Sequence, residues 1–497
     1  MKTNDKQLSR RSFLRNSAVV AGGVVLGAST LQMITAHSTW AKKQGKGGRG
    51  NSPQAIGYGP LTPVRDQDGD EILALPHGFH YVTFGKIGEI MSDGNLTPRN
   101  HDGMAAFPGP HGTVRLIRNH EVRNAPNDPN GAVGGPGDTR YDPLGVGGTV
   151  TIDYDPRRRR VVRDFVSLNG TIVNCAGGYS FGDIGWITCE ETTQGPNNGW
   201  MKKHGYCFLV PASAEETVLA VPIIPMGRFS HEACVADPST GIVYLTEDAG
   251  SGIGSGFYRY LPNDPFDLLA GGVLQILMVK NLPQYDTREG QTEGQVLPVE
   301  WVTIPDPNPD LENGEASVFD QGFGQGGAKF NRLEGIFRGE GDSVFFAATS
   351  GGDAKNGDVN SDGFEEGYGQ IWQYRPTPGG GELMLVFEST AQSVLDSPDN
   401  LCVTPRGGLI MCEDDAGSND GDTHPLAPGI TDVNRLVGLT PEGVPFEFAV
   451  NRLNDSEFAG ACFSPDGKVL FVNIFGDGTP GSGMTCAITG PWGRGPL

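Results

Sequence analysis

Acidic side chains recur at corresponding points of six similar segments in this sequence. Each segment starts with a polar residue or its substitute, runs through about six residues to a turn, and returns through a second apolar stretch that usually ends in Glu or Asp. Carboxylates held close together repel one another unless cations neutralise them. The pattern therefore predicts a centre that binds several metal ions. The leading positions of the six segments are Asp102, Cys175, Glu232, Glu334, Asp399 and Ala459.

Each of these segments is typical of a β-hairpin. Two apolar strands flank a turn that contains Pro, Gly, Asp or Asn. Antiparallel pairing returns the end of the second strand to the start of the first, so the polar residues of each hairpin should lie at one rim. The residues that end the second strands are therefore candidate metal ligands as well: Glu121, Glu190 or Glu191, Glu247 or Asp248, and Glu413 or Asp414.

Repeated hairpins without alternating helices favour a radially closed all-β fold. Six copies predict a six-bladed β-propeller, in which the innermost strand of every blade meets at one axis. The third and fourth copies are the furthest apart, so we expect an insertion between the third and fourth blades, at residues 261–330. Strand-like stretches at 273–280 and 299–304 should complete blades. The propeller would span residues 57–497, after a flexible linker at 42–56.

Cys175 is the one thiol among the leading positions. A thiolate among carboxylates indicates a softer or more oxidised metal beside hard ones, since Ca²⁺ does not select sulfur. The alternative is an ordinary buried thiol. The other seven cysteines define no disulfide framework, and most fall in strand interiors, where burial is the default: Cys189, Cys207, Cys234, Cys402, Cys412, Cys462 and Cys486.

The N-terminus resembles a twin-arginine export signal, predicted at residues 1–41. Arg10 and Arg11 precede Phe13-Leu14, an apolar run follows, and a small-x-Ala site ends at Ala41. The signal implies the twin-arginine translocase as a partner and a periplasmic or extracellular location. A formal net charge of −22 argues against nucleic acid as a partner. We expect no membrane span in the mature protein and a monomer.

Two further features leave alternatives open. His120 and His231 each precede a rim acid, so they are either donors to a substrate or polar residues packed at blade ends. The stretches that begin at Asp66 and Asp358 resemble the start of a calcium loop but do not complete it. They predict either peripheral Ca²⁺ sites or ordinary solvated turns.

Several of these motifs together resemble the PhoX-type alkaline phosphatases, over about Gly57 to Trp492. Members of that family are exported by the twin-arginine route, fold as six-bladed propellers, and hydrolyse phosphate monoesters at iron and calcium ions. One departure is the segment 179–186, which lacks the family's usual Thr-Pro-Trp-Gly pattern. The motifs that carry the resemblance are Arg118-Asn119-His120-Glu121, Asn174–Gly178 with Thr188–Glu191, Gly227–Ala233, Arg332–Gly335 and the Asp399 segment.

The resemblance implies roles for particular residues. Cys175 would bind Fe³⁺, Glu190, Glu191, Glu232, Glu334 and neighbouring rim acids would hold Fe³⁺ and Ca²⁺, and Arg332 would contact phosphate. We therefore expect Arg332, Cys175 and Glu334 to be catalytic, and Arg332, His120 and His231 to bind the substrate, a small phosphate ester. A metal-bound oxygen is the expected nucleophile, because no P-loop and no Gly-x-Ser-x-Gly motif is present.

Two other function classes fit parts of the pattern. A lactonase-like propeller hydrolase would need only one or two Ca²⁺ ions held by a few rim residues, which leaves Cys175 and many of the acids unexplained. A non-catalytic propeller that binds a partner would use Ca²⁺ only for structure. Iron content separates the metal-dependent phosphatase from both of these alternatives. Turnover separates the non-catalytic binding module from the enzymes.

Overall fold

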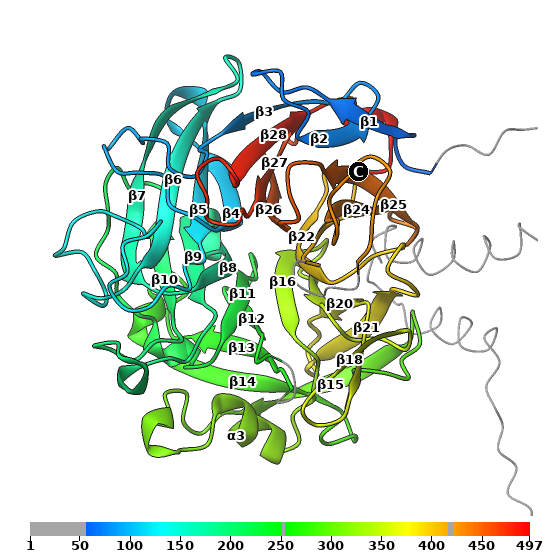
Figure 1. Cartoon of the computed structure of the whole chain (residues 1–497). Helices are drawn as coiled ribbons and strands as arrows, with labels where there is room; N and C mark the ends of the chain where they lie inside the picture. The colour runs from blue at the N-terminus through cyan, green and yellow to red at the C-terminus, as the bar shows by residue number, and fades with distance from the viewer. Residues whose placement is uncertain (1–55, 251–253, 416–420) are drawn as a thin grey trace, which may run out of the picture.

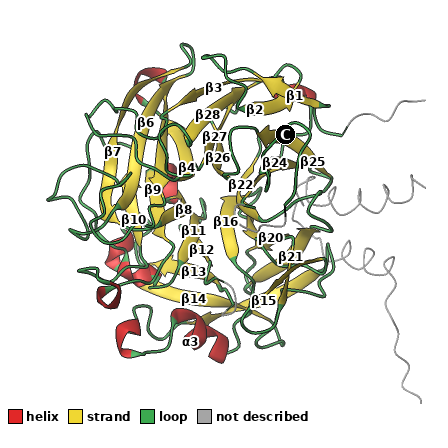
Figure 2. Cartoon of the chain, viewed as in Figure 1, coloured by secondary structure: helices red, strands yellow, loops and turns green. Residues whose placement is uncertain are grey.

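The computed structural model describes residues 56–250, 254–415 and 421–497, and its elements surround one central axis (Figure 1). Strands make up nearly all of its regular structure, and the helices are short and peripheral (Figure 2). The predicted export signal at 1–41 and all of the linker except Ile56 lie outside the described residues. In the described part of the chain, no helix is long and apolar enough to cross a membrane.

Six inner strands form a closed ring about the axis. Each inner strand contacts the next one along the chain, and the last contacts the first. The prediction of an all-β propeller is confirmed, and we interpret each inner strand with the strands outside it as one blade. The inner strands are β4 (His101–Pro108), β8 (Asn174–Tyr179), β11 (His231–Ala236), β16 (Leu333–Arg338), β22 (Pro398–Val403) and β26 (Phe458–Phe463).

Antiparallel strands extend each inner strand outward into a sheet. Strand β3, near the start of the described chain, pairs with β28 near its end, so the two ends close the ring together. The first sheet adds β5 (Val114–His120), β6 (Gly147–Asp155) and β7 (Arg160–Thr171) to β4; the second adds β9 (Gly185–Glu190) and β10 (Cys207–Pro211) to β8. The last adds β27 (Val469–Ile474), β28 (Met484–Thr489) and β3 (His80–Phe84) to β26, and the sheet before it adds β23 (Leu409–Glu413), β24 (Arg435–Leu439), β25 (Pro445–Asn451), β2 (Leu73–Pro76) and β1 (Leu61–Val64) to β22.

The third and fourth units share one continuous sheet. Strand β15 (Val296–Thr303) pairs with β14 (Gly272–Val279) on one side and with β21 (Gly381–Glu388) on the other. The strands expected at 273–280 and 299–304 are thus β14 and β15. The sheet also holds β12 (Val243–Glu247), β13 (Phe257–Pro262), β17 (Val344–Ala348) and β20 (Gln370–Arg375). A small separate sheet pairs β18 (Lys355–Val359) with β19 (Glu365–Gly367).

The helices of the described residues are all short. The α-helix α3 (Val318–Gly324) lies outside β14 (Figure 1). The remaining helices are single 3₁₀ turns in loops: η1 (Pro110–Gly112), η2 (Phe181–Asp183), η3 (Pro196–Asn198), η4 (Ile224–Met226), η5 (Leu268–Ala270), η6 (Leu311–Asn313) and η7 (Trp492–Arg494).

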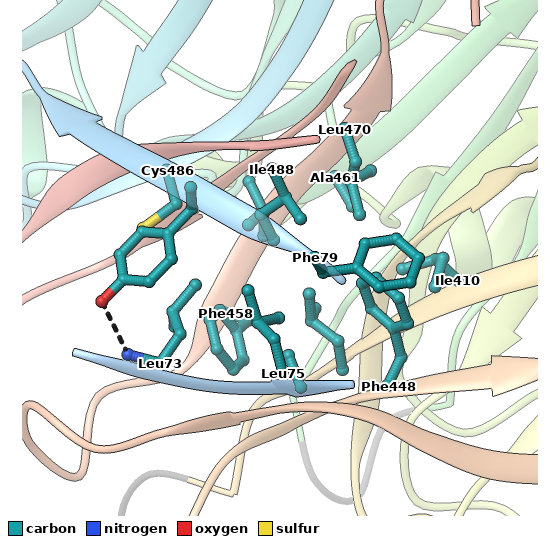
Figure 3. Close-up of a cluster of buried hydrophobic side chains, with 14 of the residues drawn as sticks. Leu73, Leu75, Phe79, Ile410, Phe448, Phe458, Ala461, Leu470, Cys486 and Ile488 are labelled. Atoms are coloured by element: carbon teal, nitrogen blue, oxygen red, sulfur yellow. Dashed lines mark hydrogen bonds between the residues drawn. The ribbon is translucent and has the colours of Figure 1, made fainter. Parts of the chain in front are cut away.

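Apolar side chains between neighbouring sheets hold the ring together. Where the two ends of the described chain meet, Leu73, Phe79, Phe448, Phe458 and Ile488 pack into one buried cluster (Figure 3). Each large apolar side chain buried in this way contributes about 1.5–3 kcal/mol. The cluster therefore stabilises the closure of the ring, on which the geometry of the axis depends.

A β-bulge occurs at the same place in every inner hairpin. In five hairpins the leading residue and the one after it together face a single residue of the second strand. In the sixth, Ala459 pairs regularly with Asn473, and the bulge holds Gly460 and Ala461. The leading position there is thus Gly460, one residue later than the sequence pattern predicted.

The second residue of the bulge is usually small. A Cβ on Gly103 would lie 2.5 Å from the Cα of Ala176, and one on Gly335 would lie 2.8 Å from the Cα of Asn400. Small residues at these points let neighbouring inner strands approach closely at the axis. The bulge bends each strand there, which re-aims the leading side chain toward one end of the axis.

Candidate metal centre

A pocket of about 260 Å³ lies at the rim where the bulges occur. Its lining draws first bulge residues and residues that follow the second strands from different hairpins, as the rim pattern predicted. The residues that line it are Asn100, Asp102, Glu121, Arg123, Cys175, Glu191, Arg332, Glu334, Asp399, Asp414, Ser456, Glu457 and Phe475.

The candidate ligand atoms form three overlapping triads. In each triad the carboxylate oxygens or the thiol sulfur all lie within 4.8 Å of one another. Cys175 belongs to the first and second triads and Glu232 to the second and third, so the triads make one continuous group with room for several cations. They are Asp102 with Glu121 and Cys175, Cys175 with Glu191 and Glu232, and Glu232 with Glu334 and Asp399.

Glu232 gives the clearest sign that a cation belongs here. Its side chain is fully buried, and among the described residues neither of its carboxylate oxygens has a hydrogen-bond partner. An ionised carboxylate buried without partners costs several kcal/mol. A multivalent cation bound between Glu232 and its triad neighbours would supply the missing partner, so these residues fit a metal cluster.

The carboxyl groups in and next to the pocket affect one another strongly. Burial raises the pKa of Asp102, Glu232 and Asp399 well above the ordinary value, and repulsion from Glu121, Glu334 and Asp414 respectively raises it further. Burial likewise raises the pKa of the Cys175 thiol, and Asp102 adds to the effect. Without cations the group would hold protons, and metal binding would displace them.

The structure separates the adjacent acids that the sequence left as alternatives. Glu191 and Asp414 line the pocket, and Asp248 lies beside it, paired with Arg332. Successive side chains of a strand point to opposite faces, so the residue before each of these points away. Those preceding residues are Glu190, Glu247 and Glu413, which do not line the pocket.

These three preceding acids are satisfied within their own blades. Glu190 lies 2.7 Å from Nδ1 of His204, and Glu247 accepts a 2.5 Å hydrogen bond from the hydroxyl of Tyr258. Glu413 pairs with the guanidinium of Arg435 at 2.6 Å. Their carboxylates therefore have protein partners in place of metal ions.

Two arginines border the pocket. Arg332 has a left-handed backbone (φ 45°), which is uncommon outside glycine, and its guanidinium lies 3.1 Å from Asp248 and 3.4 Å from Glu334. Arg123 forms ion pairs with Glu121 and Glu191, and its side chain is 56% exposed. The sequence patterns did not single out Arg123, although it stands two residues after a rim acid. Both guanidinium groups can reach an anion in the pocket.

His120 and His231 do not line the pocket. Nδ1 of His120 bonds the carbonyl of Arg99 at 2.9 Å, and Nε2 of His231 bonds the carbonyl of Gly227 at 3.0 Å. Burial lowers the pKa of His120 well below the ordinary value and that of His231 to about 3, so both rings are neutral. The alternative of polar residues packed at blade ends fits them better than contact with a substrate.

The two calcium-like stretches have other partners. The carboxylate of Asp66 accepts hydrogen bonds from the backbone of Asp68 and Asp70 and from Thr83. Asp362, in the second stretch, pairs with Arg288 and Lys329. These contacts are those of ordinary turns.

The segment that departs from the family pattern lies far from the pocket. Residues 180–184 form the turn of the β8–β9 hairpin, and none of them lines the pocket. Five residues of extended strand, about 16 Å, separate Cys175 from Ser180. The altered segment thus leaves the candidate ligands in place.

The chain is similar to known proteins in sequence and in fold. The family described as "Alkaline phosphatase PhoX" matches residues 56–480. Among solved structures, Pseudomonas fluorescens PhoX in complex with vanadate, a transition state analogue, has a TM-score of 0.62 at 17% identity, over 88% of this chain and 98% of that one. A gluconolactonase from Xanthomonas campestris has a TM-score of 0.40 at 10% identity, over 89% and 99%. No curated protein sequence matches the chain significantly.

Proposed function

The chain belongs to the PhoX alkaline phosphatase family, and from that premise we propose that this phosphatase hydrolyses small phosphate monoesters in the acidic pocket at the rim of its propeller. The observation that carries the assignment is Glu232, a fully buried carboxylate next to the pocket whose two oxygens have no partner among the described residues. Its triad neighbours all line the pocket: Cys175, Glu191, Glu334 and Asp399. Glu232 stands where two ligand triads meet. A site built in this way suits multivalent cations and, through them, an anionic substrate.

We propose Fe³⁺ and Ca²⁺ as the resident ions. Cys175 supports iron, because sulfur is a poor ligand for calcium and a good one for a transition metal. The all-carboxylate triad of Glu232, Glu334 and Asp399 suits a hard cation such as Ca²⁺. When bound, such ions neutralise the charge that phosphoryl transfer develops and lower the pKa of water at neutral pH.

The two arginines supply positively charged hydrogen-bond donors, which carboxylates cannot. A guanidinium offers paired N–H donors that match two oxygens of a phosphate. Arg332 would donate to phosphoryl oxygens from the side of Glu334 and Asp248, and Arg123 from the side of Glu121 and Glu191. With a substrate bound, both would exchange part of their pairing with carboxylates for pairing with phosphate. The structure of Pseudomonas fluorescens PhoX in complex with vanadate, a transition state analogue, supports a site for a phosphate-like anion in this family.

We further propose that the chain is exported by the twin-arginine route to the periplasm or beyond, with the mature protein starting near Lys42 and acting as a monomer. The arginine pair at Arg10 and Arg11 supports this proposal. Replacing both by Lys should leave the protein unprocessed inside the cell. Normal secretion of the double variant would contradict it.

The function is tested on the purified mature protein with 4-nitrophenyl phosphate as the probe and a simple lactone as the comparison. We expect release of phosphate, iron and calcium in the protein, loss of turnover with a chelator, and recovery on adding Ca²⁺ while iron is retained. Lactone hydrolysis without phosphate release would overturn the proposal. So would phosphate release that persists after complete metal removal.

A further inference from the structure

The residue directly before an inner strand repeats one backbone conformation. In four of the six blades it has a left-handed backbone, with φ between 43° and 56°, which is uncommon outside glycine. These residues are Asn100 before β4, Val173 before β8, Arg332 before β16 and Ser397 before β22. Asn100 and Arg332 both line the pocket, whereas Val173 and Ser397 do not. Asn100 therefore has in the first blade the position that Arg332 has in the fourth.

The side chain of Asn100 has one occupied end and one open end. Its Oδ1 accepts a 2.8 Å hydrogen bond from Nε of Arg99. Nε of an arginine can only donate, so the oxygen of the amide faces Arg99 and the NH₂ group faces away from it. Asn100 is 8% exposed, and within residues 56–250, 254–415 and 421–497 its amide nitrogen donates no hydrogen bond. Two N–H donors are thus left at the wall of the pocket.

Backbone hydrogen bonds fix Asn100 beside a candidate ligand. The carbonyl of Asn100 accepts a 3.0 Å hydrogen bond from the backbone N–H of Glu121. The carbonyl of Arg99 is bonded by Nδ1 of His120 at 2.9 Å, and the N–H of Arg99 donates to the carbonyl of Gly131 at 3.0 Å. Because the residue is already held in place, its amide loses little conformational freedom when it binds an anion.

We propose that Asn100 binds the phosphoryl group of the substrate through its amide N–H donors, opposite Arg332. The inference rests on the proposed phosphatase function. Strand β16 stands three places from β4 in either direction round the ring of inner strands, so Arg332 and Asn100 approach the axis from opposite sides. A phosphoryl group bound between them would receive hydrogen bonds from both.

An uncharged donor suits this place better than a charged one. Phosphate oxygens and ionised carboxylates are both acceptors, so a pocket rich in acids has few groups that can donate to a phosphate. A second guanidinium would repel the cations that the triads would hold, whereas an amide donates without adding charge. Cations bind the oxygen of an amide, and in Asn100 that oxygen is occupied by Arg99. The open end of the side chain is therefore suited to an anion and not to a metal ion.

Two substitutions separate this role from a structural one. Asn100→Ala removes both ends of the amide. Asn100→Asp keeps an acceptor for Arg99 but replaces the donors with a carboxylate oxygen, which repels phosphate. In the full mature protein, purified without chelator, we expect kcat/KM for 4-nitrophenyl phosphate to fall about 10- to 100-fold in Asn100→Ala. The fall should be larger in Asn100→Asp. Calorimetric titration with inorganic phosphate should show affinity decreasing in the same order.

The opposite order would overturn the inference. If Asn100 only accepted the hydrogen bond from Arg99, Asn100→Asp would stay closer to the wild type than Asn100→Ala. Loss of iron or calcium from folded Asn100→Ala would overturn it too, because it would make Asn100 part of the metal site. Asn100→Asp retains the bond to Arg99, so it also covers the case in which Asn100→Ala fails to fold.

Ser397→Ala is the matched control. Ser397 has the same left-handed position, and its hydroxyl donates to Asp396 at 3.1 Å. This variant should keep wild-type turnover and phosphate affinity. Wild-type protein that releases no phosphate from the ester would remove the proposed function, and the titration would still test the donor. Equal phosphate affinity in wild type and Asn100→Ala would overturn the inference whatever the turnover assay shows.

Discussion

Adjacent acids at the ends of the second strands have different surroundings. Glu190, Glu247 and Glu413 are buried and bonded to His204, Tyr258 and Arg435 of their own blades. The next residues, Glu191, Asp248 and Asp414, turn to the pocket side, where carboxylates outnumber the available donors. Burial alone does not separate the two sets, because Asp248 is as buried as the first three acids, whereas Glu191 and Asp414 are half-buried. What distinguishes a candidate metal ligand here is the shortage of protein partners.

The largest effect on activity should come from substituting Glu232, whose carboxylate oxygens both lack a hydrogen-bond partner among the described residues. Glu232→Gln keeps the size of the side chain but removes the charge that two triads share. We expect loss of bound metal and a fall in kcat/KM of at least about 10³-fold, or roughly 4 kcal/mol of transition-state stabilisation. Metal analysis and phosphate release measure the two effects.

Glu247→Gln is the matched control on the same hairpin. Burial raises the pKa of Glu247 to about 8, so at neutral pH it is mostly the uncharged acid that Gln resembles. The variant should keep its metals and its turnover. If Glu247→Gln lost metal as Glu232→Gln does, the distinction between the two sides would be wrong.

Substitution of an acid that points into its own blade should lower the free energy of unfolding. Glu413→Ala leaves the buried guanidinium of Arg435 without its closest carboxylate, which costs about 3–5 kcal/mol of folding free energy. Asp414→Ala, one residue later, should weaken metal binding and change the stability of the metal-free protein far less. Denaturant unfolding in chelator compares the two. Equal destabilisation by both substitutions would contradict the comparison.

Much of this arrangement could be predicted from the sequence. Alternating apolar strands, turn residues and the recurring leading acids were sufficient for the hairpins, the rim and the meeting of Cys175 with Glu232 and Asp399. The choice between Glu190 and Glu191 was not available, because it depends on where the second strand ends and which face its last residue takes. The sixth leading position is Gly460 and not Ala459, because Ala459 still pairs regularly with Asn473, and the sequence does not show where regular pairing gives way to the bulge.

Arg123 shows a second limit. Nothing in its local sequence marks it, because it precedes a long loop and acquires its role only when Glu121 and Glu191, from different hairpins, converge on it. His120 and His231 show the reverse. Their position beside rim acids suggested contact with a substrate, but the strand alternation that directs the acids to the pocket turns these rings into the blades.

Arg332 gives the next largest effect, on the reaction itself. Arg332→Lys keeps a positive charge beside Asp248 and Glu334 but loses the paired donors. We expect metals to be retained and kcat/KM to fall by about 2–4 kcal/mol of transition-state stabilisation. Arg123→Lys should cost less, because its side chain is more exposed, at 56% against 31%. Wild-type turnover by Arg332→Ala with its metals in place would show that Arg332 only stabilises the rim.

The smallest expected effect is a change of stability with pH, and it comes from an acid that points into its blade, Glu190, and its partner His204. On the blade side, His204 is buried, and although burial alone would lower its pKa, the carboxylates of Glu190 and Asp142 raise it to about 9. A protonated His204 therefore stabilises the fold below its unfolded pKa of about 6.5, and this contribution is lost as pH rises through 9. Between pH 7 and pH 8.5 the free energy of unfolding should fall by about 2 kcal/mol from this group.

The control for this effect is His204→Gln, which has no charge to lose. Unfolding of metal-free wild type and His204→Gln at pH 7 and pH 8.5 isolates the contribution, since the pocket carboxyls are the same in both proteins. The wild type should lose its advantage over the variant as the pH rises. If the difference in stability stayed constant across this range, His204 would be neutral in the folded protein, and Glu190 would be held by its backbone donors at Gly205 and Ile172. Glu190 would then need neither a protonated partner nor a metal ion, which would sharpen its contrast with the pocket acids.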